Sequence, residues 1–561
     1  MNQLKGLKRK KTMILVILAV IAILAGIVVA VRPSARTNPE LKEAGFTALK
    51  NGSKAITKDE NRKQKLIVAV DLIDGCLNPA FATASADRMA CELIYEPLAE
   101  VNLDGTYDPV LAESVEWNQE TLTMTVKLKP GIQFSDGTPV TADDVCASIG
   151  LNCLAEYNLD TEGPYFHIKG VWDRNEQKTQ GISGIRKKDD NTVELEFMDG
   201  YSQNWDILET KIQKNRFATI DGQLSGFGDV AGYYNSGVGT GPYMEESMVL
   251  GLNLILKANP NYRGTVNDIK QVEFSQTNFY DVKEAVENQM IDVVFYTATS
   301  EQFDTMYGGK QFDVYARPTD SIYGLGFNTT NIFLKDENVR RAIAYAFNKE
   351  NALNKDWKMK IAPTDVIGYG VAGACDQFQS AAITYDKSKA ESMIKEAALE
   401  GRIELRFPVL KENEFQMHMA SCIKKDLEAV GIEVKIKECT SEEYVQALYV
   451  EDKFDLYLFN STMNYDWNTF EAITMPRDGM PVAFLDNDYV ELVNRVRSAM
   501  NREEYLTSLT ELSNKFYEKV PVIPFGRVQR YLSVSADLSG YGASPESNML
   551  EQVNEIRSSA K

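Results

Sequence analysis

The sequence predicts an α/β fold made of several units. From residue 386 onward, short apolar strands alternate with amphipathic helices, a pattern typical of parallel strands covered by helices. Nearer the N-terminus, segments 122–128 and 193–197 alternate apolar with polar residues, as strands with one buried face do. The chain has 561 residues, 44% of them hydrophobic and 25% charged. It is therefore long enough for more than one core and has an ordinary globular composition.

The N-terminus, residues 1–35, is expected to be a signal sequence or membrane anchor. Five basic residues at positions 5–11 precede an unbroken apolar run, 13–31, which is long enough to span a membrane and places the chain's body outside the cell. The run is longer than the usual signal core of about 7–15 residues, and the first cysteine, Cys76, lies too far downstream for lipid attachment. We therefore favour a retained anchor, followed by a polar tether over residues 36–65.

Each element of the body follows from a local pattern. Strands are expected where short runs are apolar or alternate, and helices where apolar residues recur at spacings of three and four. Thr141 followed by Asp144 resembles a capping box, Asp386 and Asn413 are helix starts, and Gly431 is a helix stop. The expected strands are 65–70, 122–128, 193–197, 291–296, 403–407, 432–436 and 454–459, and the expected helices are 87–98, 142–154, 282–290, 339–348, 386–399, 413–430 and 442–450.

Composition and missing motifs exclude several kinds of function. A net charge of −20 disfavours nucleic acid as a partner. With only two histidines, His167 and His418, chemistry that needs paired histidines is nearly excluded, and we expect ordinary surface or packing roles for both. There is no phosphate loop, no G-x-S-x-G elbow, no H-E-x-x-H and no C-x-x-C. We therefore predict no catalytic residues, no metal and no cofactor. Seven cysteines leave at least one unpaired within the chain, while others could pair outside the cell.

Several motifs appear in an order that resembles one known family. They are 95–100 (YEPLAE), 104–114 (DGTYDPVLAES), 128–145 (LKPGIQFSDGTPVTADDV), 239–243 (GTGPY), 339–343 (VRRAI) after Asn328, and 520–524 (VPVIP). Together they resemble the family 5 extracellular solute-binding proteins, the oligopeptide- and dipeptide-binding components of ABC importers. The resemblance extends over roughly residues 66–545.

The resemblance implies a two-lobed, periplasmic-binding-protein-like fold that closes on its ligand like a flytrap, with an extra subdomain. Lobe 1 would comprise residues 66–100, 182–315 and 517–561. The subdomain would be 101–181, and the second lobe would be 316–516, which agrees with the strand–helix alternation found there.

The resemblance also implies ligand-binding residues. Tyr165 resembles a tyrosine that reaches the ligand from the subdomain, and Thr240 and Gly241 lie in a turn whose backbone faces the ligand in relatives. After the strand at 454–459, the family carries an aspartate that binds the peptide's α-ammonium group, where this chain has Asn464. The candidate ligand-binding residues are thus Tyr165, Thr240, Gly241, Asn464, Tyr465, Asp466 and Trp467. Arg340 and Arg341 could bind a carboxylate or form salt bridges.

The expected function is capture of peptides or peptide-like solutes at the extracytoplasmic face of the membrane, by a monomer that is anchored or secreted and delivers them to an ABC permease. Because Asn464 is uncharged, the same fold could instead bind a metal chelate, an opine or an oligosaccharide. A sensor subunit that presents signalling peptides is a further alternative. An enzyme is disfavoured, because no catalytic constellation is present.

Overall fold

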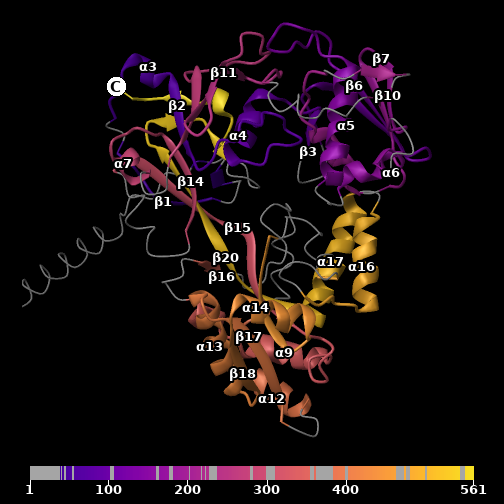
Figure 1. Cartoon of the computed structure of the whole chain (residues 1–561), viewed down its shortest axis with the longest axis vertical. Helices are drawn as coiled ribbons and strands as arrows, with labels where there is room; N and C mark the ends of the chain where they lie inside the picture. The colour runs from indigo at the N-terminus through magenta and orange to yellow at the C-terminus, as the bar shows by residue number, and fades with distance from the viewer. Residues whose placement is uncertain are drawn as a thin grey trace, which may run out of the picture.

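The computed structural model describes most of the chain beyond residue 37. The described residues are 38, 41–42, 46–53, 56–101, 107–158, 163–175, 181–200, 202–215, 218–220, 223–225, 237–277, 282–298, 310–353, 359–361, 383–397, 402–462, 473–474, 481–499, 502–543 and 550–560. Figure 1 shows an upper body, a second unit beside it and a lower body. We call them lobe 1, the subdomain and lobe 2.

A mixed sheet runs through the molecule and belongs to both lobes. Its order is β1–β15–β20–β14–β2–β13–β12–β11, with β16 on β20 and β19 on β15. β2 is parallel to both of its neighbours, whereas β11, β12 and β13 pair antiparallel. The strands are β1 (Thr47–Lys50), β2 (Lys65–Val70), β11 (Tyr243–Val249), β12 (Asn253–Ala258), β13 (Gln271–Gln276), β14 (Val293–Ala298), β15 (Phe312–Phe327), β16 (Met359–Ile361), β19 (Leu456–Thr462) and β20 (Val522–Ser535).

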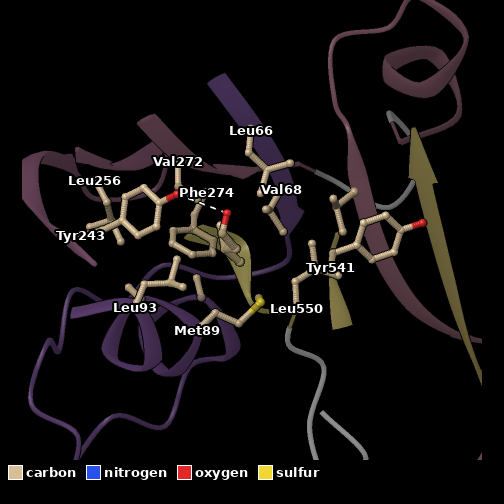
Figure 2. Packing of buried hydrophobic residues seen from close by; sticks show 14 of the residues in the cluster. Leu66, Val68, Met89, Leu93, Tyr243, Leu256, Val272, Phe274, Tyr541 and Leu550 are labelled. Atoms are coloured by element: carbon tan, nitrogen blue, oxygen red, sulfur yellow. Dashed lines mark hydrogen bonds between the residues drawn. The ribbon is translucent and has the colours of Figure 1, made fainter. Parts of the chain in front are cut away.

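The core of lobe 1 lies between this sheet and α4 (Ser85–Ile94). Val68 of β2, Phe274 of β13 and Leu93 of α4 are buried in one cluster (Figure 2). Tyr243 at the start of β11 is fully buried in the same cluster, and its hydroxyl donates to the carbonyl of Ile269 at 3.0 Å. Because its one polar group is satisfied, this tyrosine can fill the core like a phenylalanine. Two shorter helices, α3 (Glu60–Lys63) and α7 (Val282–Glu287), also belong to lobe 1 (Figure 1).

The described residues of 38–58, which we call the strap, pack along lobe 1. Leu41 and Phe46 are buried in its core, and the Arg317 guanidinium lies 5.6 Å from the centre of the Phe46 ring. β1 adds itself to the sheet by antiparallel pairing with β15. The sequence suggested a polar tether over 36–65 because these residues are rich in charge. Backbone pairing and a few buried side chains hold the described part in place instead. Neither the pairing nor the burial can be predicted from the local hydropathy of the sequence.

The subdomain is a four-stranded antiparallel sheet with a long helix on one face. The sheet order is β5 (Ala112–Asn118), β6 (Thr123–Leu128), β8 (Thr192–Glu196) and β7 (Ile185–Asp189). Met124 and Val126 of β6 and Val193 and Leu195 of β8 point into the core beside α5 (Ala142–Asn158). The alternation predicted for these two strands is confirmed. Three short helices, η1 (Pro164–His167), α6 (Val171–Asn175) and η2 (Ser202–Glu209), complete the unit.

Lobe 2 has the strand–helix alternation that the sequence predicts. β17 (Glu404–Leu410) and β18 (Glu433–Cys439) are parallel, and α13 (Glu414–Glu428) connects them. α9 (Glu337–Ala346) packs against α12 (Lys387–Ala397), while α16 (Asn487–Arg497) and α17 (Arg502–Lys519) form a pair that rises from lobe 2 toward the subdomain in Figure 1. Lobe 2 has its own apolar cores, separate from that of lobe 1.

Most predicted elements are present, with shifted ends. β2 matches its predicted range residue for residue. α4 ends at Ile94 instead of residue 98, because the residue before Pro97 is pushed out of the helical conformation. The predicted helix at 442–450 is α14 (Ser441–Val445) followed by one turn of π-helix, Gln446–Val450. The helix starts predicted at Asp386 and Asn413 are confirmed. The Asp386 carboxylate accepts a hydrogen bond from the backbone N–H of Lys389, and the Asn413 side-chain oxygen accepts one from the backbone N–H of Gln416.

The predicted membrane segment 1–35 and the possible pairing of cysteines can now be compared with the structure. Within the described residues, no helix combines the length and the hydropathy needed to cross a membrane, and the predicted segment 1–35 lies outside them. None of the six described cysteines forms a disulfide, and five of them are buried. Burial raises the pKa of the Cys146 thiol to about 12 and the pKa of Cys91 well above its usual range. Buried, protonated thiols of this kind are poor nucleophiles.

Candidate functional site

Strands β15 and β20 pair along almost their whole length and connect the lobes. Tyr315 and Leu532 lie in the core of lobe 1, whereas Leu325 and Phe525, further along the same strands, lie in a core of lobe 2. The pairing register shifts between Pro318 and Ile322 and again between Tyr323 and Gly324. Such irregularities bend a strand pair and interrupt its hydrogen-bond ladder. We call this region, 317–323 of β15 with 526–530 of β20, the crossing.

Two arginines are buried at the crossing. Arg317 and Arg527 are 1% and 2% exposed. Arg527 Nη1 donates to the carbonyl of Thr319 at 3.2 Å, and Arg317 Nε donates to the carbonyl of Pro318 at 3.4 Å. The arginines therefore donate hydrogen bonds to carbonyl groups in the stretch of β15 where the pairing register with β20 shifts. The sequence analysis did not single them out, although a proline inside a strand pattern is itself a signal of a bulge.

The carboxyl ends of the parallel strands of lobe 1 point toward the crossing. Ala298, at the end of β14, pairs with Gln529 of β20, and β2 runs parallel to β14. In α/β sheets, ligands bind outside the carboxyl ends of the strands. The candidate site is therefore the space between lobe 1 and lobe 2 next to the crossing. A strand of each lobe ends there: β14 of lobe 1 and β19 of lobe 2.

Four of the predicted ligand-binding residues, Asn464, Tyr465, Asp466 and Trp467, lie outside the described residues. The strand before them is described, and it ends at the crossing: Thr462 of β19 pairs with Ser321 of β15. As ligand contacts, the four residues remain predictions.

Tyr165 is half-buried in the subdomain. Its hydroxyl lies 2.9 Å from Thr210 Oγ1, and either oxygen can be the donor. Two residues on, His167 Nδ1 lies 2.9 Å from Asp199 Oδ1. These contacts connect η1 to the residue directly after η2 and to the segment before it. The structure therefore gives Tyr165 a defined orientation, and its contact with a ligand remains a prediction.

Thr240 and Gly241 lie inside lobe 1. Thr240 is 1% exposed. The N–H of Gly241 donates to the carbonyl of Ile94 at 2.8 Å, and its carbonyl accepts from Asn259 Nδ2 at 2.8 Å. A Cβ on Gly241 would lie 2.5 Å from the carbonyl oxygen of Leu93, which explains the glycine. Both backbone groups of Gly241 are thus used within the lobe, and the geometry favours a structural role for this turn.

A charged pair next to this turn connects the first sequence motif, 95–100, to the segment after β12. The Arg263 guanidinium donates two hydrogen bonds of 2.9 Å each to the Glu96 carboxylate. Burial raises the pKa of the Glu96 carboxyl, and the Arg263 guanidinium and the nearby Thr240 oppose that rise. The pair holds the segment after α4 against the segment after β12.

Arg340 is a structural residue and no carboxylate receptor. It is 2% exposed, and its guanidinium donates to the carbonyls of Lys519, Val520, Leu334 and Lys335. Burial lowers the pKa of Arg340 to about 10, and nearby acidic groups oppose the shift. The arginine therefore ties α9 to the carbonyls at the end of α17, which no helical N–H can serve.

An open hollow of about 720 Å³ lies elsewhere, on the outer face of the subdomain sheet. Its charges pair with one another: Arg186 contacts Glu194 at 3.0 Å and Glu196 at 2.7 Å. This is a solvated sheet face, separate from the space between the lobes. No group of three or more His, Cys, Asp or Glu side chains suited to a metal ion occurs in the described part of the chain.

Two lobes with separate cores, joined by a pair of shared strands, define the class of hinged solute-binding proteins. The chain matches the model of the family described as "Bacterial extracellular solute-binding proteins, family 5 Middle" over residues 106–475, well over half of its length. This chain belongs to family 5 of the bacterial extracellular solute-binding proteins, as its motifs predicted.

Known relatives and structures agree with this assignment. The chain is 20% identical to the oligopeptide-binding protein AppA of Bacillus subtilis, over 97% of this chain and 98% of that protein. It is 26% identical to the dipeptide-binding protein of Escherichia coli, over 66% of this chain and 70% of that protein. The unliganded open form of the periplasmic murein tripeptide binding protein MppA has the same fold, with a TM-score of 0.71 at 16% identity, covering 90% of this chain and 99% of that one.

Proposed function

We propose that this solute-binding protein captures peptides or peptide-like solutes between its two lobes and delivers them unaltered to the membrane subunits of an ABC importer. The observation that carries the proposal is the crossing: β15 and β20 enter two separate cores, so the lobes can rotate about it while both cores stay intact. The names of the oligopeptide- and dipeptide-binding relatives support peptides as the solute class.

Binding follows from a shift between open and closed arrangements. A ligand that contacts both lobes favours the closed arrangement by its extra affinity for it, and a ligand that contacts only one lobe shifts nothing. Extended peptides suit such a site, because their backbone groups can bond to both walls without demanding one sequence.

We further propose that residues 1–35 hold the protein at the extracytoplasmic face of the membrane and that it acts as a monomer. The basic residues before the apolar run 13–31 support the anchor. Membrane fractionation of the full chain tests it: the chain should stay with the membrane in high salt and leave only with detergent.

Two measurements test the ligand class. Native mass spectrometry of the purified chain should reveal a bound peptide, and calorimetry should detect binding from a tryptic digest of casein but none from nickel chelates or oligosaccharides. Binding of a chelate, an opine or a sugar with no peptide binding would overturn the peptide proposal. The uncharged Asn464 keeps those solutes in the comparison.

X-ray scattering tests the hinge. The radius of gyration should fall when casein peptides that calorimetry has identified are added, because closure brings the lobes together. A radius that stays the same with bound peptide would contradict the closing mechanism.

A further inference from the structure

Four exposed apolar residues lie on neighbouring segments at one corner of lobe 1. Leu72 follows β2, and Val249, Leu250 and Leu252 form the turn between β11 and β12. Their exposed fractions are 50, 52, 64 and 58%. Soluble proteins expose single apolar side chains often, but a contiguous group of them marks a surface that binds something. We call these four residues the apolar knob.

The apolar knob is a rigid feature. The N–H of Leu252 donates to the carbonyl of Val249 at 3.0 Å, and Gly251 has a φ of +75°, which suits this tight turn. The Leu252 carbonyl in turn accepts from the N–H of Gln276 at 2.8 Å, and the side chain of Gln276 accepts from the N–H of Ile73 at 3.1 Å. The turn and the loop after β2 are therefore fixed to each other.

The apolar knob lies at the end of the lobe 1 sheet that points toward lobe 2. Gln276 pairs with Val70 at the carboxyl ends of the parallel strands β13 and β2, and those ends face the crossing. In the sheet order, however, β11 and β12 are the strands farthest from β15 and β20. The apolar knob is thus on the outer lip of lobe 1, away from the crossing.

The exposed charged residues that closely precede or follow the apolar knob in the chain are acidic. Asp71 and Asp74 are exposed on either side of Leu72, and Glu246 is exposed on β11. Neither segment 71–87 nor segment 243–256 contains a lysine or arginine. Anionic lipid headgroups would repel such a surface. A protein pocket with an apolar interior and a basic rim would complement both the charge and the hydropathy of this surface.

We propose that the apolar knob is the point at which lobe 1 docks onto the membrane subunits of the importer, in an extracytoplasmic pocket with an apolar floor and a basic rim. The inference rests on the proposed function, because only a receptor that delivers its solute has this partner. A preformed turn loses little conformational freedom on docking, which favours binding. Its place on the outer lip leaves the crossing free to move while the receptor is docked.

The first test separates docking from ligand binding. In the full chain, Leu250→Ser together with Leu252→Ser should leave the affinity for casein-digest peptides within about twofold of the wild type. Uptake of the same peptides by host cells that carry only this variant should fall at least tenfold. Ile332→Ser is the matched control, because Ile332 is also 64% exposed but sits in lobe 2, in the turn before α9. It should change neither quantity.

Two results would overturn the inference and leave the proposed function standing. Normal uptake by the double variant would show that the apolar knob is no docking point. A tenfold loss of peptide affinity would instead assign it to ligand contact or to closure against lobe 2.

A second test does not depend on knowing the ligand. Leu250→Cys, labelled with benzophenone maleimide and irradiated on host cells, should crosslink to a membrane subunit of an ABC importer, identified by mass spectrometry. Ile332→Cys and the labelled wild-type chain measure the background, including any label on Cys422. Crosslinks from Leu250→Cys at background level, or to lipid alone, would contradict docking even if peptides prove to be the wrong solute.

Discussion

The ammonium group of Lys58 lies 2.9 Å from the Oδ2 atom of Asp537, although 479 residues separate them in the chain. Both side chains are almost fully buried. Lys58 also forms an ion pair with Asp292 at 2.9 Å, and Asp292 forms a second ion pair with Arg62 at 2.6 Å. This cluster joins the end of the strap and α3 to the residue before β14 and to the segment after β20, so segments from both ends of the chain are held at one point.

Removing the buried cation should destabilise lobe 1 strongly. Lys58→Met leaves two carboxylates buried with one partner fewer, and breaking a buried ion pair in this way costs about 3–5 kcal/mol. Urea unfolding followed by circular dichroism measures the change. Lys63→Met is the control: Lys63 pairs with the exposed Glu60 and should lose less than about 1 kcal/mol. Equal losses in both variants would mean that the buried cluster contributes nothing special.

The same cluster should make stability depend on acid. Burial alone would raise the pKa of Asp537, but hydrogen bonds from Ser535 and the charge of Lys58 outweigh it and hold the pKa below its usual range. A carboxyl with a depressed folded-state pKa stabilises the protein above its unfolded-state pKa of about 3.9, and this contribution is lost as the pH falls through the folded-state value. The stability gap between wild type and Asp537→Asn should therefore shrink below about pH 4. A gap that stays constant from pH 7 to pH 3 would contradict the assignment.

Arg340 should matter for stability and leave ligand binding alone. Arg340→Met removes the donors for the carbonyls of Lys519 and Val520, and unsatisfied buried carbonyls cost about 1–3 kcal/mol each. Thermal unfolding should show the loss. Arg495→Met, which breaks an exposed pair with Glu511, should change stability by less than about 1 kcal/mol. If Arg340→Met instead lost peptide affinity with an unchanged melting temperature, the arginine would be a ligand contact after all.

Gly326 of β15 should tolerate no side chain. A Cβ at this position would lie 2.0 Å from the ring of Tyr457 on the neighbouring β19, so Gly326→Ala should cost about 1–3 kcal/mol through overpacking. A double-mutant cycle in urea unfolding tests the cause: with Tyr457→Ala present, the added methyl group should cost much less. Additive losses would point to another source of the strain.

Asn464→Asp should restore a charge that the family carries. The resemblance places an ammonium-binding aspartate at this position, and a charge-assisted hydrogen bond is roughly twice as strong as a neutral one. Calorimetry should find peptides with a free α-amine bound about tenfold more tightly, a gain of about 1.4 kcal/mol. N-acetylated peptides serve as the control and should bind with unchanged affinity. A gain for both kinds of peptide would argue against an ammonium contact.

Local patterns in the sequence predicted only part of the elements: β11, β12, β13, β15, β20, α16 and α17 were not predicted. β2 was predicted over its full range, and the capping side chains of Asp386 and Asn413 were identified, because strand periodicity and helix caps involve residues that are close in the chain. β1 was missed because its partner, β15, lies more than 260 residues away and only two of its own four side chains are apolar. Long-range pairing of this kind leaves no local signal.

The candidate site was less predictable than the fold. Family motifs pointed to Thr240 and Arg340, and both are buried. The Arg340 guanidinium donates to backbone carbonyls of its own lobe, which a motif cannot reveal, and the ligand contact of Thr240 stays a prediction. The arginines of the crossing carry no motif, and their role depends on a register shift between strands that lie about 200 residues apart. Exposure of the apolar knob could not be predicted either, because a short apolar run does not reveal which of its residues a turn will expose.

The lack of disulfides among the described residues has a practical consequence. Because none of the six described cysteines is cross-linked, the described part of the fold needs no oxidant to form, and a reducing agent breaks no covalent bond in it. That part should therefore assemble equally well in a reducing cell interior, where a protein that depends on disulfides would have to be refolded.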